Sequence, residues 1–299
     1  MKNLKLTESK RDIITGYIYV LPGLIFMLVL IGYPIVYNWI LSFQDLNAMN
    51  INRGTVNFVG LGNYRKVLAD EVMRIAFKNT FLYTVGSLII QFTIGFALAL
   101  FFNHKFRFGE QIRGLLVISY MMPITVTALL YKFMLSPDGI INYLLTGLGL
   151  IKQPIPWLLQ ESTALWGVII ANGWIGIPFN MLLLTTGLTN IPGDIYESAA
   201  VDGANAWQRF VQITLPLLKP AIYSVLMLGF VYTFKVFDLV YVMTSGGPVN
   251  ATEVLSTHSY KLSFRYFYFG EGAAVANVLF LCLFAVALVY LRMLRKEEV

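Results

Sequence analysis

The sequence has few of the residues on which soluble enzymes depend. Charged residues make up 13% of its 299 residues, against roughly 25% in a typical soluble domain, while hydrophobic residues make up 57%. The single cysteine, Cys282, excludes a disulfide within the chain, and its apolar surroundings indicate a small buried side chain. The shortage of charge and the long apolar runs together indicate an integral membrane protein.

Motifs that carry chemistry are also missing. No G-x-x-x-x-G-K-[ST] loop occurs, so ATP hydrolysis would need another chain. We interpret His104 and His258 as solvated loop side chains on opposite sides of a membrane, which cannot share a metal. Asp238 and Glu197 are too separated to form a catalytic pair. The sequence predicts no enzymatic activity, no metal site and no cofactor of its own. The chain has a net charge of +6, and its basic residues flank the apolar runs. This arrangement favours a lipid bilayer over nucleic acid as partner.

Six apolar stretches are long enough to cross a bilayer, which takes roughly 20 residues. They predict an all-α integral membrane protein whose six transmembrane helices form a single domain over residues 1–299. Prolines in the first and third stretches predict kinks, and Gly176 with Pro178 predicts a local break in the fourth. Residues 67–76 predict a short amphipathic helix at the membrane surface. The six stretches are 17–43, 80–102, 114–135, 163–188, 217–243 and 272–294.

Lysine and arginine are distributed unequally along the chain. Six spans place both termini on one side, and that side is richer in Lys and Arg, with Lys105, Arg107 and Arg113 in one of its loops. Positive loops favour the cytoplasm. We therefore expect a multi-pass protein of a prokaryotic cytoplasmic membrane, with both termini and the polar stretch 190–220 on the cytoplasmic side.

The stretch 190–220 is the longest polar interruption and carries strong local signals. Pro192 favours the start of a helix, because a first-turn N–H has no partner inside the helix. Gly203 belongs to a turn signal, and a second helical run over 204–213 follows, which Pro216 is expected to end. The pattern predicts a helix–turn–helix at the membrane surface, suited to docking rather than to chemistry.

This stretch resembles the loop by which membrane subunits of binding-protein-dependent ABC importers dock onto their ATPase. The family pattern is E-A-A, three residues, G, nine residues, I, one residue and L-P. This chain matches it in spacing, with Ser198 where the family usually has Ala. The resemblance implies that ATPase docking involves Glu197, Ser198, Ala199, Asp202, Gly203, Ile213, Leu215 and Pro216.

Other segments, in order along the chain, resemble the sugar-importing branch and its maltose-type first permease. They are Leu21-Pro22-Gly23, Phe58-Val59-Gly60-Leu61-Gly62-Asn63-Tyr64, Pro156-Trp157-Leu158-Leu159 and Thr244-Ser245-Gly246-Gly247-Pro248. The resemblance implies the type I ABC importer permease fold. It also implies a second homologous permease subunit, two copies of an ATP-binding subunit and an extracytoplasmic solute-binding protein. ATP would then be held by the partner subunit, and the first helix would pack on the partner permease.

Polar residues inside apolar spans are expensive in lipid and therefore informative. A sugar path needs aromatic faces together with amides and hydroxyls. Gln91 is interpreted as helix–helix glue, whereas Lys235 and Asp238 fit either substrate contact or mutual neutralisation. The resemblance implies sugar contacts at Tyr120, Asn172, Ile175, Gly176, Phe179, Tyr232 and Thr233, and we add Trp174, Lys235 and Asp238.

The sequence therefore favours the permease subunit of an ATP-driven sugar importer that works by alternating access. Relatives carry amides on the fifth span where this chain has Thr233, Lys235 and Val236. This difference argues against maltose itself and suits an oligosaccharide with an acidic group near Lys235. The alternative is a self-sufficient ion-coupled secondary transporter, which would need membrane-embedded carboxylates and usually a repeated half. Asp238 is the one acid in the later part of a span, and no repeat is visible.

Overall fold

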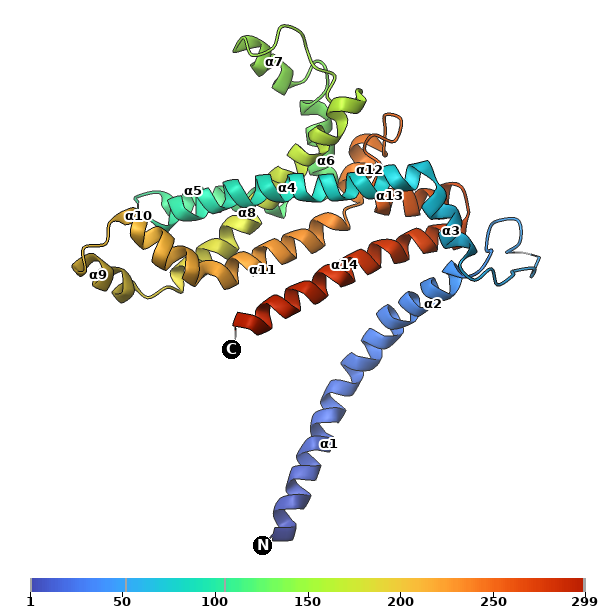
Figure 1. Ribbon diagram of the computed structural model, residues 1–299, viewed down its shortest axis with the longest axis horizontal. Helices are drawn as coiled ribbons and strands as arrows, with labels where there is room; N and C mark the ends of the chain where they lie inside the picture. The colour runs from blue at the N-terminus through green and yellow to red at the C-terminus, as the bar shows by residue number, and fades with distance from the viewer. Residues whose placement is uncertain (1, 52, 105, 298–299) are drawn as a thin grey trace. The chain divides into compact units, whose positions relative to one another are not determined.

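A computed structural model describes residues 2–51, 53–104 and 106–297. Over these ranges the chain is helical and contains no extended strand, apart from one isolated bridge between Gln44 and Phe58 (Figure 1). The predicted all-α class is therefore confirmed. Lys105, counted above among the cytoplasmic charges, lies outside the described residues.

The described chain packs as two compact units. The first consists of the residues up to Val67 together with Lys261–Asn277, and the second of Leu68–Tyr260 together with the residues from Val278 onward. Helix α14 (Phe269–Glu297) contributes residues to both units. The single domain over the whole chain stays a prediction.

The first unit begins with a long helical rod made of α1 (Lys2–Met27), a π-helical turn η1 (Leu28–Gly32) and α2 (Tyr33–Ser42). Its apolar part, Thr15–Ser42, is long enough to span a membrane, and none of its most apolar window is buried by the rest of the chain. The π turn ends where the Tyr33 N–H donates to the Leu28 carbonyl, directly before the predicted kink site Pro34.

A polar network closes the first unit at the end of α2. The Asn63 side chain, on α3 (Gly62–Ala69), donates to the carbonyls of Ser42 and Gln44, each at 2.9 Å. The Tyr64 hydroxyl bonds the Ser42 hydroxyl at 2.8 Å and accepts from Asn277 Nδ2 at 3.0 Å. Buried polar groups of this kind are satisfied by one another, so they serve the fold rather than a ligand.

Helices α4 (Glu71–Asn103) and α8 (Glu161–Thr189) form the centre of the second unit and pack along each other. Glycines permit the close approach: a Cβ at Gly95 would lie 2.6 Å from the Asn180 Cβ, and one at Gly173 would lie 2.7 Å from Ile90 Cγ2. Small residues at helix interfaces are typical of membrane bundles, where close packing drives association. Helix α11 (Leu215–Phe234) packs against both helices.

The third predicted span is broken rather than kinked. Helices α5 (Gly109–Met121) and α6 (Ile124–Met134) meet at an angle of 97°. Pro123 has no N–H and forces the preceding residue out of the helical region, so Met122 is extended, with ψ 137°. Within the described residues, five helices are long and apolar enough to cross a membrane. The bent α5–α6 pair makes a sixth if it counts as one span.

Three predicted boundaries need correction. Helix α8 runs through Pro178 without a break, and the Asn180 side chain adds a 2.8 Å bond to the Gly176 carbonyl. The fifth span ends at Phe234, and a separate helix α12 (Asp238–Thr244) follows it and packs against α6. The helix predicted over 67–76 is interrupted at Asp70, whose carboxylate accepts the Val72 N–H at 3.2 Å and starts α4.

The loops carry shorter helices, and one histidine prediction fails. These helices are α7 (Ile140–Gly147), α9 (Gly193–Val201), α10 (Ala206–Arg209), α13 (Leu255–Tyr260) and two more π turns, η2 (Phe210–Thr214) and η3 (Lys261–Arg265). His104 is exposed, as expected. His258, in contrast, is 4% exposed on α13, and its Nε2 lies 3.7 Å from the Asp70 carboxylate. It is a packed side chain because α13 folds against the start of α4.

Candidate functional site

A cavity of about 330 Å³ lies within the second unit, where α8 and α11 meet the α5–α6 bend and the start of α12. It brings together residues that are far apart in sequence and that the sequence analysis had selected. The selected residues that line it are Tyr120, Asn172, Ile175, Phe179, Tyr232, Thr233, Lys235 and Asp238.

Aromatic rings form one side of this cavity. Tyr120 and Phe179 are stacked, with ring centroids 5.8 Å apart, and Tyr232 meets Phe179 edge-on at 6.1 Å. Tyr120 and Tyr232 are 45% and 58% exposed, so both keep a face free for a ligand. Such faces stack on the apolar face of a ring-shaped ligand, and the hydroxyls remain available for hydrogen bonds.

Two amide side chains also line the cavity, those of Gln91 and Asn172. The Gln91 side chain on α4 donates to the Asn172 backbone carbonyl on α8 at 3.0 Å, so it ties the two helices together and also lines the cavity. Asn172 is 8% exposed, and its Nδ2 has no hydrogen-bond acceptor in the described part of the chain. A buried donor without a partner is costly, and a ligand oxygen in the cavity would satisfy it.

Two predicted residues do not line the cavity. Asn172, Ile175 and Phe179 share one face of α8, whereas the helical period turns Trp174 to another face, where it is 44% exposed. Gly176 has a packing role instead, because a Cβ there would lie 2.2 Å from the Gln91 Cδ. Gly176 thus leaves the space that Gln91 occupies.

Lys235 and Asp238 both reach the cavity, but neither neutralises the other. Among the described residues no ion pair within 4.0 Å joins them, because the chain leaves the helix between Phe234 and Asp238. The Lys235 ammonium instead lies 5.4 Å from the centroid of the Tyr232 ring. This contact favours a cation held against the ring face and leaves the charge free to meet a ligand.

The sequence analysis did not identify four further lining residues, Ile124, Gly229, Val236 and Phe237. Their neighbours gave the only available signals: Pro123 at the α5–α6 bend, and the polar pair that interrupts an apolar stretch at Lys235 and Asp238. These two helix breaks open the cavity, because chain at a break exposes side chains that a continuous helix would turn away.

The docking loop contains the predicted helix and turn. Helix α9 ends at Val201, and Gly203 adopts a left-handed conformation with φ +80° that lets the Ala204 N–H reach the Ala199 carbonyl at 2.9 Å. Asn205 then caps α10: its side chain accepts the Gln208 N–H at 2.9 Å, and Gln208 Oε1 accepts the Asn205 N–H at 2.8 Å.

Pro216 does not end the second helical run, contrary to the prediction. The η2 turn inserts a residue, so that the Leu215 N–H donates to the Phe210 carbonyl and the chain continues into α11 through Pro216. A wider π turn accommodates the ring and the missing N–H of proline. The same arrangement precedes Pro34, where η1 leads into α2.

The predicted docking residues differ in exposure. Glu197, Ser198, Asp202, Gly203 and Pro216 are exposed, whereas Ala199, Ile213 and Leu215 are half-buried. Tyr196 holds α9 against the root of α11 through a 2.9 Å bond to the Thr214 hydroxyl. The sequence analysis overlooked Val201 and Trp207, which are 88% and 72% exposed at the tip of the loop.

Comparison with known proteins places these features in a family. Residues 91–296 match the family described as binding-protein-dependent transport system inner membrane component. The trehalose/maltose transport system permease protein MalF of Thermococcus litoralis is 33% identical over 294 residues, covering 97% of this chain and 95% of that protein. The lactose transport system permease protein LacF of Rhizobium radiobacter is 33% identical over 272 residues, covering 90% of each.

A solved structure shares the fold. A chain of a bacterial ABC transporter involved in the import of the acidic polysaccharide alginate superposes with a TM-score of 0.81 at 23% identity, covering 98% of this chain and 99% of that one. This likeness confirms the predicted permease fold. Together, the family match and the identity over nearly the whole chain show that the protein belongs to the binding-protein-dependent transport system inner membrane component family, whose members are transport components rather than enzymes.

Proposed function

We propose that this chain is the permease subunit of an ATP-driven importer that carries sugars, and in particular oligosaccharides, across a prokaryotic cytoplasmic membrane. The cavity between α8 and α11 carries the proposal, because it pairs stacked aromatic faces with a buried amide donor that lacks an acceptor. Curated relatives whose names specify trehalose, maltose or lactose support the same class of substrate.

The charge of the cavity limits the substrate further. Lys235 and Asp238 place one positive and one negative group at its wall, without an ion pair between them. A substrate with an acidic group would meet Lys235, and its neutral hydroxyls would meet Asp238. The sequence-based proposal of an acidic group near Lys235 therefore has a free ammonium to support it.

The docking loop supports the proposed partners. Exposed Glu197 and Ser198 on α9, with exposed Gly203 in the turn that follows, present small and acidic groups to a soluble subunit, which would hold the ATP. In this proposal the loop and both termini face the cytoplasm. A second permease, two ATPase copies and an extracytoplasmic binding protein complete the importer. No feature of the described residues favours the ion-coupled secondary transporter.

The test is sugar-dependent transport by the complete complex. The chain, with the subunits that copurify with it, is reconstituted in proteoliposomes, and uptake of neutral and acidic oligosaccharides is measured with ATP inside or outside. We expect uptake to need ATP on the docking-loop side and to fall about two- to tenfold in Tyr232→Ala, because stacking faces of this kind contribute about 0.5–1.5 kcal/mol beyond area burial. Tyr143→Ala, at a 73% exposed position on α7, is the control. Uptake driven by an ion gradient without the ATPase would overturn the proposal.

A further inference from the structure

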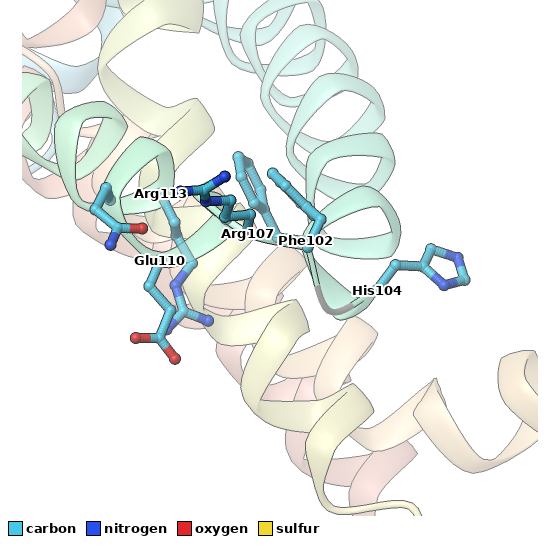
Figure 2. A pocket seen from close by; sticks show the side chains of 8 residues that line it. Phe102, His104, Arg107, Glu110 and Arg113 are labelled. Atoms are coloured by element: carbon cyan, nitrogen blue, oxygen red, sulfur yellow. The ribbon is translucent and has the colours of Figure 1, made fainter.

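The loop between α4 and α5 forms a second cavity that the transport proposal does not use. Its volume is about 370 Å³, and its walls come from the end of α4 and the start of α5 (Figure 2). Arg107, Glu110 and Arg113 gather on one side, while the His104 ring points away from them (Figure 2). All of these residues lie in the second unit.

The two arginines of this cavity are available to an anion. Arg107 is exposed and Arg113 half-buried, and in the part of the chain that the structure describes neither guanidinium has a carboxylate within 4.0 Å. Arg107 lies 5.3 Å from the centroid of the Phe108 ring, a contact that helps to position it. Guanidinium groups recognise phosphate through paired N–H donors.

The start of α5 supplies a second, independent feature. Its N-cap residue is Phe108, which cannot cap the helix through its side chain. Gly109 donates to the Phe106 carbonyl and Ile112 to the Phe108 carbonyl, so the N–H groups of Glu110 and Gln111 have no acceptor among the described residues. Uncapped N–H groups at the positive end of a 13-residue helix attract anions.

Apolar side chains lie beside the charged groups of this cavity. Phe102 and Phe106 line it and stack on each other at 5.9 Å, and Phe101 packs edge-on against Phe102 at 5.2 Å. Phe101 is 56% exposed near the end of α4, within an apolar span. A ligand here meets hydrocarbon surface beside a cationic cavity, which is the chemistry of a phospholipid rather than of a soluble ion.

We propose that this cavity binds the phosphate group of an anionic phospholipid, with an acyl chain against Phe101. The site lies at the docking-loop end of the bundle, because His104 also lines a neighbouring cavity with Tyr196, Arg209 and Phe210. The proposed function puts this end of the bundle in the cytoplasmic leaflet. That placement rests on the proposed function, whereas the binding of the phospholipid does not.

Glu110 allows a test in which one variant weakens lipid binding and another strengthens it. It lines the same cavity and repels an anion there. One surface arginine contributes about a fivefold change in affinity for anionic lipid, so the double variant Arg107→Gln/Arg113→Gln is expected to weaken binding about 25-fold. Glu110→Gln is expected to strengthen it about fivefold. A variant that merely misfolds cannot give the second result.

The experiment titrates the purified full-length chain in detergent, with and without its copurifying subunits, and follows lipid-dependent thermal stabilisation. The probes are phosphatidylglycerol, phosphatidylcholine and inorganic phosphate. Arg74→Gln, which removes one exposed arginine at the far end of α4, is the control and should behave like the unaltered chain. We expect phosphatidylglycerol to stabilise at lower concentration than phosphatidylcholine, with the shifts given above.

Four outcomes overturn the site. They are equal stabilisation by both lipids, full stabilisation by inorganic phosphate alone, an equal loss in Arg74→Gln, and an arginine effect that appears only with the ATPase bound. The last would assign Arg107 and Arg113 to a protein contact. Because the readout is lipid binding, a chain that binds phosphatidylglycerol but imports no sugar would contradict the proposed function and leave this inference intact.

Discussion

The Gln91 side-chain amide donates a 3.0 Å hydrogen bond to the Asn172 carbonyl, and it reaches that carbonyl because residue 176 has no Cβ. One position thus links the packing of α4 on α8 to the wall of the cavity. The contact is local in space but joins residues 81 positions apart in the chain.

Gly176→Ala is expected to disturb the cavity more than the fold. The added Cβ would lie 2.2 Å from the Gln91 Cδ, so Gln91 must leave the Asn172 carbonyl. Overpacking of this kind costs about 1–3 kcal/mol. The melting temperature and the rate of sugar uptake should both decrease. Gly114→Ala, where no atom lies within 4 Å of the new Cβ, should leave both unchanged. Normal uptake by Gly176→Ala would show that the Gln91 contact has no part in transport.

Asn172→Leu separates ligand binding from folding. The Asn172 Nδ2 has no acceptor among the described residues, so its removal loses no hydrogen bond within the chain. The loss of one hydrogen bond to the substrate is expected to raise the substrate concentration for half-maximal uptake about tenfold. We expect that change in concentration-dependent uptake, with a melting temperature that is unchanged or higher, because the substitution removes a buried donor that has no acceptor among the described residues. A large fall in melting temperature with unaltered half-saturation would assign Asn172 to structure alone.

Glu197→Lys is expected to uncouple the permease while leaving it folded. Glu197 is exposed on α9 and makes no ion pair among the described residues, so reversal of its charge affects what docks there. The expected result is loss of ATPase copurification and of uptake, with normal membrane insertion. Glu161→Lys, at an exposed position in the first turn of α8, is the matched control.

Gly203→Asp tests the same loop through its backbone. Gly203 has φ +80°, a conformation that other residues adopt at a cost, and an aspartate adds charge to the docking surface. Uptake should disappear although the chain still inserts. ATPase recovery and uptake that match those of the unaltered chain would show that the turn plays no part in coupling.

Asn142 organises the loop after α6 and offers a stability test. Its Nδ2 donates to the carbonyls of Ser136, Pro137 and Ile155, and its Oδ1 accepts from the Ile155 N–H and the Trp157 indole N–H. Asn142→Ala leaves these buried groups unpaired, at a cost of about 1–3 kcal/mol for each group that water cannot reach. The melting temperature of Asn142→Ala should therefore be lower. Thr146→Ala, at an exposed position on the same helix, should leave the melting temperature unchanged.

Sequence reasoning predicted the helices well where apolar length decides them. The spans that became α4, α8 and α14 agree with the prediction, because roughly 20 apolar residues leave little choice of structure. It did less well at prolines, since a proline breaks, bends or passes through a helix according to its neighbours. Pro123 breaks the third span, Pro178 lies inside an unbroken α8, and Pro216 follows a π turn.

The sequence predicted the kinds of side chain that line the cavity, but not which of the selected residues would face it. Asn172, Ile175 and Phe179 follow the helical period and line it together. Gly176 was selected from the resemblance, and the facing helix decides its role, because Gln91 fills the space beside it. The burial of His258 against Asp70 depends on contact between the start of α4 and α13, which no local pattern reveals.

The π turn before Pro216 has a mechanical consequence. Because the helix is not interrupted there, Ala206–Phe234 is one rigid lever of 29 residues, about 43 Å long, with the docking loop at one end and Thr233 at the other. A tilt of about 5° at the docking end would carry the Thr233 end through roughly 4 Å, from that length alone. A displacement of that size is comparable to the reach of a sugar hydroxyl. In the proposed importer, the cavity therefore lies where a small rotation imposed at the loop would be most amplified.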